Sequence, residues 1–183
     1  MKTLISRLRA RPVTSVIALV ALLLAAGFGI TAWAMDDSID TNDVVNQAGG
    51  YSLQVPDDWQ TTQQARTTTV TSPGKDAVLR VGAGQAGPLE QVAALFFQQV
   101  GRQYRDVQLL GIQAEDVGAK PALVYAGIGT NSKNVRVRFL AITVANKPAN
   151  YAIGVFTSDG SDAERVLPRV NTVVDTFRPL DKR

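Results

Sequence analysis

The amino-acid sequence predicts an α+β domain, a twisted antiparallel sheet with helices packed on it. Three observations predict this class. Apolar residues recur with helical spacing in two segments, 89–104 and 163–177. Three apolar stretches lie between them, at 121–129, 134–145 and 151–158, and their links of about five residues are too short for parallel crossovers. Two amphipathic helices need an apolar sheet face to cover, and a sheet of this kind provides it.

The other elements follow in order along the chain. Alternating apolar and polar residues at 51–55 predict a strand, and the threonine-rich second half of 60–72 favours another. The sequence Ser-Pro-Gly-Lys-Asp at 72–76 predicts a turn, so 77–84 is the returning strand of a hairpin. A further strand is expected over 107–117. Together these elements account for the residues between the N-terminal segment and the last helix.

The N-terminal segment predicts a single-pass membrane protein. Residues 1–12 hold four basic residues, and Val13 to Ala34 then carry no charge. As a helix, this run would be about 33 Å long, which spans a bilayer core of about 30 Å. Because cations precede the run and none follows soon after it, we expect residues 1–12 in the cytoplasm, residues 13–34 as a transmembrane helix in the cytoplasmic membrane, and the domain outside.

A second interpretation of the same segment stays open. Ala32–Ala34 resembles a signal-peptidase site, and cleavage after Ala34 would secrete the domain. In either case the acidic residues 35–50, which end in Gly-Gly, are expected to form a flexible stalk. The folded extracytoplasmic domain is expected to cover residues 51–183.

Composition excludes several chemistries. The chain has no His and no Cys, which excludes a Ser-His-Asp triad, a thiol nucleophile, disulfides and His- or Cys-ligated metal. The exported residues 35–183 hold 15 basic and 16 acidic residues, so they are not a basic nucleic-acid-binding surface. We expect no cofactor and no metal.

A glycine motif at 82–87 raises the possibility of a nucleotide site. Gly82, Gly84 and Gly87 form G-x-G-x-x-G between an expected strand and an expected helix. A dinucleotide fold also needs further parallel crossovers, but no helical stripe occurs between residues 120 and 161. The glycines are therefore expected to serve a tight strand-to-helix turn.

Three stretches resemble the PsbP-like superfamily, which includes the PsbP photosystem proteins, the Mog-type Ran-binding proteins and exported LpqN/LpqT-like proteins of actinobacterial envelopes. The resemblance covers about residues 50–180 and implies an α/β/α sandwich around an antiparallel sheet, in a protein that binds or assists rather than catalyses. The LpqN-like branch is the most similar in architecture, although this chain lacks the cysteine of a lipoprotein. The matching residues are Tyr51, Leu53, Val55, Pro56 and Trp59; Gly118, Pro121 and Ala122; and Val173, Val174 and Phe177.

Five residues are candidates for contact with a ligand or partner. Arg136 and Arg138 alternate in one expected strand, with Asn134 on the same face, and could bind a carboxylate, a phosphate or a lipid headgroup. The alternative is a solvated edge of the sheet. Trp59 could be an interface anchor or could cover the edge of the core, and Phe97 could be core or the lip of an apolar groove.

The sequence therefore favours a membrane-tethered, non-enzymatic binding or accessory module of the cell envelope. Its partner would be an envelope lipid or a membrane protein. One alternative is an exported hydrolase or transferase that uses Ser, Lys or carboxylates. Another is a structural or signalling protein, for which only about twelve residues precede the membrane segment.

Overall fold

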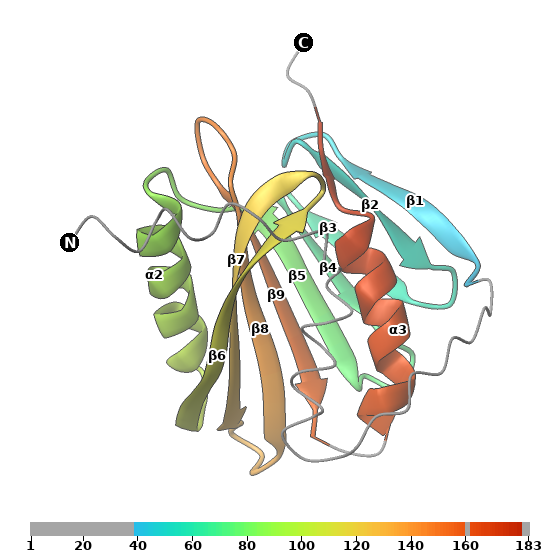
Figure 1. Ribbon diagram of the computed structural model, residues 1–183. Helices are drawn as coiled ribbons and strands as arrows, with labels where there is room; N and C mark the ends of the chain where they lie inside the picture. Colours follow the sequence, from blue (N-terminus) through green and yellow to red (C-terminus); the bar gives the residue numbers. More distant parts are fainter. Residues whose placement is uncertain (1–38, 160–161, 181–183) are drawn as a thin grey trace.

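The computed structural model describes residues 39–159 and 162–180 (Figure 1). Within them, the main element is a seven-stranded sheet in which every neighbouring pair is antiparallel. From one edge to the other, its strands are β3 (Gln60–Gln64), β4 (Thr67–Thr71), β5 (Ala77–Ala83), β9 (Tyr151–Ser158), β8 (Arg136–Val144), β7 (Lys120–Thr130) and β6 (Arg105–Val117). The α+β class and the antiparallel order expected from the short links are confirmed.

One face of this sheet forms the larger core beneath helix α3 (Asp162–Asp175). Leu79 and Ile153 from the central strands are fully buried here, together with Val170 and Phe177 of the C-terminal segment. The helix packs against the side of the sheet formed by β5 and β9 and against β2 (Tyr51–Pro56). The apolar stripe predicted for residues 163–177 therefore faces the sheet, as its spacing indicates.

The opposite face carries a smaller, aromatic core beneath helix α2 (Leu89–Gly101). Phe139 of β8 lies at its centre, with its ring centroid 5.5 Å from that of Tyr104 and 5.7 Å from that of Phe97. A Cβ on Gly127, its cross-strand partner on β7, would lie 2.7 Å from the Phe139 ring. Glycine at this position lets the aromatic ring lie directly on the neighbouring strand.

A second, three-stranded sheet corrects the expected stalk. Thr41–Asn46 forms β1, which pairs antiparallel with β2, and β10 (Arg178–Pro179) pairs with the other side of β2. The prediction of a flexible stalk extending to residue 50 is therefore wrong for 41–50. Among the aspartates that suggested a stalk, Asp43 lies on this strand, where its side chain is exposed while the backbone is paired with β2.

The glycine motif at 82–87 has a structural role. Strand β5 runs antiparallel to both of its neighbours, so the parallel crossover of a dinucleotide fold is not formed there. The Gly84 N–H donates to the Asn150 carbonyl oxygen at 2.6 Å, and a Cβ on Gly84 would lie only 2.9 Å from that oxygen. Gly84 thus permits close packing of the β8–β9 loop, just before α2 begins.

The predicted transmembrane segment, residues 13–34, lies outside the described residues. Within the part of the chain that the structure describes, neither helix combines the length and the apolar character that a membrane crossing requires.

Candidate functional site

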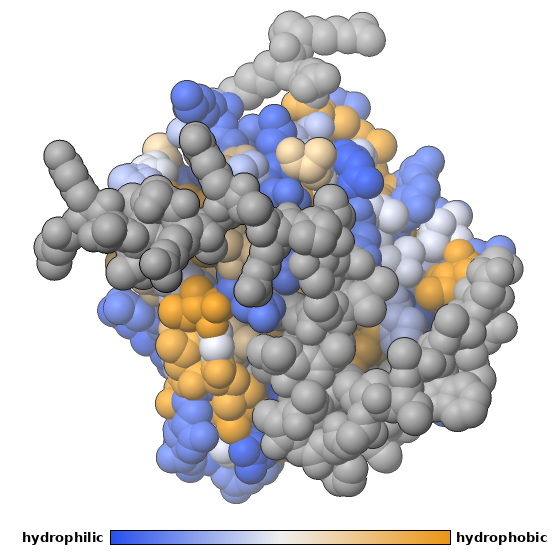
Figure 2. All heavy atoms as spheres, viewed as in Figure 1, coloured by the Kyte–Doolittle hydropathy of each residue, from blue (hydrophilic) through white to orange (hydrophobic). Residues whose placement is uncertain are grey.

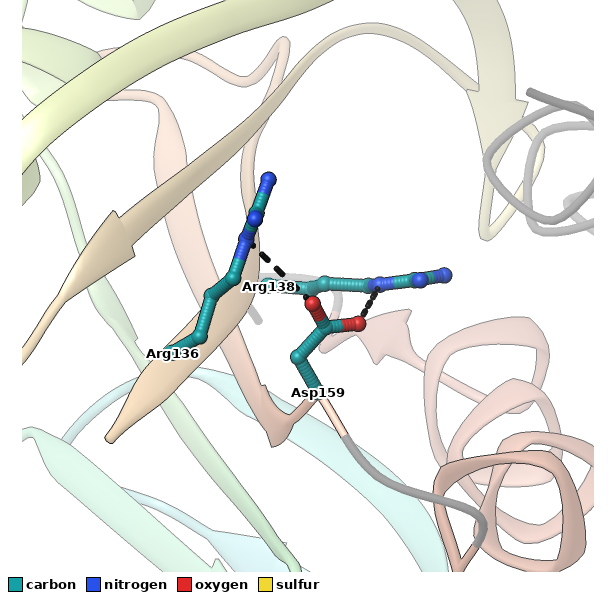
Figure 3. A network of polar contacts seen from close by, with 3 residues as sticks. All are labelled: Arg136, Arg138 and Asp159. Atoms are coloured by element: carbon teal, nitrogen blue, oxygen red, sulfur yellow. Dashed lines mark hydrogen bonds and ion pairs between the residues drawn. The ribbon is translucent and has the colours of Figure 1, made fainter. Parts of the chain in front are cut away.

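The two candidate arginines meet a carboxylate at one end of the main sheet (Figure 3). Arg136 and Arg138 extend from the same face of β8, and Asp159, just after β9, lies between them. Asp159 is 2.6 Å from the Arg138 Nε through one carboxylate oxygen and 3.3 Å from the Arg136 Nε through the other. The Asp159 N–H also donates to the Arg136 carbonyl oxygen at 3.0 Å, which holds the backbone of Asp159 beside β8.

Asn134 reaches this end of the sheet by a different route from the one expected. It lies in the β7–β8 turn with φ of 61°, before β8 begins, so it does not alternate with the arginines along a strand. Its side-chain oxygen accepts a hydrogen bond from the Arg105 guanidinium. Arg105 starts β6 and lies in the same cross-strand row as Thr130 and Arg136. A third arginine, which the sequence pattern did not single out, therefore joins the group.

This arginine group has more positive than negative charge among its named members. One carboxylate, Asp159, faces the guanidinium groups of Arg136 and Arg138, whose side chains are 62% and 30% exposed. A partly exposed ion pair of this kind contributes about 0–1 kcal/mol to stability. Asp159 already occupies the space between Arg136 and Arg138. The binding of an external anion by this group stays a prediction.

Trp59 and Phe97 are both placed by packing. Trp59 is only 6% exposed and belongs to the larger core, so it covers the edge of that core and is not available as a surface anchor. Phe97 is half-buried, with its ring centroid 5.5 Å from that of Tyr125. It belongs to the aromatic core beneath α2. The candidate residues thus fall in separate places and do not form one site.

The edge strand β6 carries an apolar surface that the sequence analysis missed. Leu109, Leu110 and Ile112 are 49%, 44% and 49% exposed. Figure 2 shows an orange area on the side of the molecule where Figure 1 draws β6 and α2, with hydrophilic surface at its lower end. We call these three residues the β6 apolar patch. The signal was present in the sequence as an apolar run, Leu-Leu-Gly-Ile, but the run alone does not show that the strand lies at an edge.

Irregular pairing explains why consecutive side chains are exposed in this patch. The register of β6 against β7 shifts between Arg105 and Gln108 and again between Leu109 and Gly111. A bulge of this kind bends the strand and re-aims its side chains, so Leu109 and Leu110 do not follow simple alternation. From Gly111 to Val117 the pairing with β7 is regular. The outer side of β6 has no neighbour among the described strands.

An open groove lies beside α2 on the second face of the sheet. Helix α2 packs on β7 and β8, and the adjacent surface of β4, β5 and β9 forms a hollow of about 580 Å³. Three aromatic side chains, Phe96, Tyr104 and Phe156, contribute to its walls, and Arg80 supplies a positive charge. The groove lies on the face opposite to Arg136 and Arg138, so those arginines cannot serve it.

Two carboxyl groups near the end of α3, those of Glu115 and Asp175, have raised pKa values. Burial raises the pKa of Glu115 on β6, and the carboxylates of Asp175 and Asp116 raise it further. Burial also raises the pKa of Asp175, although the Arg178 guanidinium opposes this increase. Within the described residues, no group of three or more acidic, His or Cys side chains is placed to hold a metal ion.

The raised pKa values predict a pH-dependent stability. Both carboxyl groups bind a proton more tightly in the folded than in the unfolded chain, so their stabilising contribution is complete below the unfolded pKa and is lost as the pH rises through the folded pKa. We expect Glu115→Gln to increase the free energy of unfolding at neutral pH and to have little effect near pH 4. Urea unfolding at both pH values, with the exposed Asp57→Asn as control, measures this. An equal effect at both pH values would contradict it.

The chain was compared with protein families, curated proteins and solved structures. No family model matches the chain, and no curated protein matches it in sequence. Among solved structures, cyanobacterial PsbP from Synechocystis is 16% identical with a TM-score of 0.56, and the match covers 82% of this chain and 98% of that one. The Ran-binding protein Mog1p of Saccharomyces cerevisiae is 11% identical with a TM-score of 0.57, covering 79% and 97%.

A third similar structure is LpqN of Mycobacterium tuberculosis, a protein involved in cell envelope biogenesis. It is 15% identical with a TM-score of 0.50, and the match covers 93% of this chain and 100% of LpqN. The resemblance to the PsbP-like and Mog1 fold group, with LpqN as a similar structure, is therefore confirmed at the level of the fold. At these identities, the similarity carries no assignment of a partner.

Proposed function

We propose that this chain is a membrane-tethered, extracytoplasmic and non-enzymatic binding module of the cell envelope, which docks a protein partner on β6. The observation that carries this proposal is the β6 apolar patch. Its three aliphatic side chains are each close to half exposed on an edge strand. Grouped exposed apolar residues on an otherwise polar surface are typical of interaction sites.

The size of the patch is sufficient to drive association when it is combined with other contacts. Complete burial of a leucine or isoleucine side chain contributes about 1.5–3 kcal/mol. Because each side chain of the patch is about half exposed, docking would add about 1 kcal/mol for each one. Arg105 at the start of the same strand would supply a polar rim contact.

The similar structures support a binding role of this kind. Mog1p is named as a Ran-binding protein, so a protein of this fold binds another protein. LpqN is described as involved in cell envelope biogenesis, so the fold also occurs in a protein that serves the envelope. Neither similarity identifies the partner of this chain.

The proposed tether follows from the N-terminal sequence. If residues 13–34 remain as a transmembrane helix, only residues 35–40 separate them from the start of β1 at Thr41. Six extended residues span at most about 21 Å, so the domain would stay close to the membrane and a partner in that membrane would be within reach. An intact mass of the mature protein that begins at Met35 would instead establish secretion after cleavage at Ala34.

The groove beside α2 supports a second candidate function, the binding of an amphiphile. Its volume of about 580 Å³ falls in the range of small-molecule sites, its aromatic walls suit an acyl or prenyl chain, and Arg80 would face an anionic head. Native mass spectrometry of the full chain distinguishes the two functions. A bound lipid that is lost in Ala152→Phe, which fills the groove, would favour the amphiphile.

Site-specific crosslinking in cells tests the docking proposal. A photoreactive residue at Leu110 is expected to form an adduct of defined mass with one membrane or envelope protein. The same residue at Thr61 on β3, an exposed position at the opposite edge of the sheet, is the matched control. Equal adducts from both positions, or none from Leu110, would reject β6 as the docking surface.

A further inference from the structure

A polar pocket lies at the end of the domain opposite to Arg136 and Arg138. Its volume is about 490 Å³. Separate segments meet around it: the β1–β2 turn, the β3–β4 turn, the start of β7, the β8–β9 loop and the C-terminal Pro179 and Leu180. These segments gather at the upper end of the molecule in Figure 1. No single stretch of sequence could have revealed this pocket.

The charges around the pocket have one sign. Arg66, Lys120 and Lys147 line it, and each comes from a different segment. The residues that line it include no aspartate or glutamate. The three side chains are exposed to solvent, and none of them has a carboxylate within ion-pair distance among the described residues. Three positive charges therefore converge on one hollow without a described counter-charge.

Other arginines in the structure form ion pairs with carboxylates. Arg136 and Arg138 share Asp159, and the Arg169 guanidinium lies 2.8 Å from an Asp58 carboxylate oxygen. The domain therefore places carboxylates beside its cations in those places but not among the residues that line this pocket. Grouping like charges costs free energy in the empty protein, and an anion bound between them would remove that cost.

The wall of the pocket is fixed by hydrogen bonds. The Tyr151 hydroxyl donates to the Gly50 carbonyl oxygen at 2.6 Å, and the Leu180 N–H donates to the same oxygen at 2.9 Å. These bonds join β9, the β1–β2 turn and the C-terminal segment. Burial raises the pKa of Tyr151, and the positive charge of Arg66 opposes that rise. The hydrogen bonds give the pocket a preformed wall.

We propose that this pocket binds a phosphate group, either of a soluble phosphorylated compound or of a lipid headgroup. A phosphate monoester or diphosphate carries two or more negative charges, which matches three converging cations better than a single carboxylate does. The planar Arg66 guanidinium can form paired hydrogen bonds with phosphate oxygens, and the two lysines can act as mobile point charges. A pocket of about 490 Å³ is large enough for a phosphate with an attached organic group.

The position of the pocket indicates how it would be approached. Strand β1 runs from Thr41, where the N-terminal segment enters, to Asn46, which immediately precedes the pocket-lining turn. Six residues of strand extend about 17–20 Å, so the pocket lies at the end of β1 that is remote from the point of entry. A phosphate compound in solution and a headgroup presented by another surface both fit this placement, and the test must separate them.

The test uses the full chain in nanodiscs of neutral phosphatidylcholine, with sodium pyrophosphate as the soluble probe in isothermal titration calorimetry. We expect saturable binding that the double variant Lys120→Gln/Lys147→Gln weakens at least tenfold. The matched control is Lys75→Gln/Lys133→Gln, which removes two exposed lysines from other turns and is expected to leave the affinity within twofold. Equal melting temperatures of the variants establish that each remains folded.

A second arm adds vesicles that contain phosphatidic acid, a lipid whose headgroup is a phosphate monoester. Pyrophosphate binding without association with these vesicles identifies a soluble phosphate compound as the ligand class. Vesicle association that pyrophosphate displaces, and that the pocket variant loses, identifies a lipid headgroup. Absence of saturable binding to either probe, or equal weakening by both double variants, would overturn the proposal.

Discussion

Replacing Phe139 with alanine is expected to lower the free energy of unfolding by about 3–5 kcal/mol. The side chain is 1% exposed and packs against Phe97 and Tyr104 at ring-centroid distances of 5.7 and 5.5 Å. Its ring also covers Gly127, which has no side chain to fill the space that would be left. Since domains of this size are stable by about 5–15 kcal/mol, the loss would remove a large part of the total.

Equilibrium unfolding in urea measures this effect. Leu95→Ala on α2 is the matched control, because Leu95 is 45% exposed and its truncation should cost less than about 1 kcal/mol. The Phe139→Leu variant should recover part of the loss by filling most of the cavity. If Phe139→Ala were no more destabilising than Leu95→Ala, the aromatic core beneath α2 would not be the second centre of packing.

The double variant Leu109→Ser/Ile112→Thr is expected to reduce the yield of the crosslink from position 110 at least tenfold. Both substitutions remove apolar surface from the β6 apolar patch and retain residues that a strand tolerates. Because each side chain is about half buried in the free domain, the double variant should lower the free energy of unfolding by about 2 kcal/mol, which leaves the domain folded. A loss of crosslink yield in a domain that remains folded therefore reports a loss of binding.

A control for this variant lies on another exposed strand. Val45→Thr on β1 removes a side chain that is 43% exposed and lies outside the patch. It should leave the crosslink unchanged. A double variant that crosslinks as well as the unmodified protein would show that the patch carries no binding energy, whereas parallel losses in all variants would indicate a general change in the protein.

Much of the fold follows from local periodicity. The α2 and α3 stripes, the β4–β5 hairpin and the strands from β7 to β9 could all be predicted, because each pattern reports directly on which side chains are buried. Strand β1 could not be predicted in this way. Its exposed polar residues resemble a linker, and it is held mainly by backbone pairing with β2, which has no signature in side-chain pattern.

The candidate surfaces show where sequence reasoning ends. The alternation of Arg136 and Arg138 correctly placed both side chains on one face of a strand. Their carboxylate partner, Asp159, lies more than twenty residues away and depends on the pairing of β8 with β9. Lys120 and Lys147 likewise converge on one pocket only because the sheet brings the start of β7 and the β8–β9 loop to the same end.

Hydrogen–deuterium exchange of the full chain in native membranes, compared with the purified chain in neutral nanodiscs, tests the docking role of β6 most directly. The outer side of β6 has no paired strand among the described elements, so its amides are open to solvent in the isolated domain. A docked partner predicts slower exchange in Arg105–Val117 in the native membranes, with no change at the opposite edge in Gln60–Gln64. Identical exchange of Arg105–Val117 in the two samples would contradict the account.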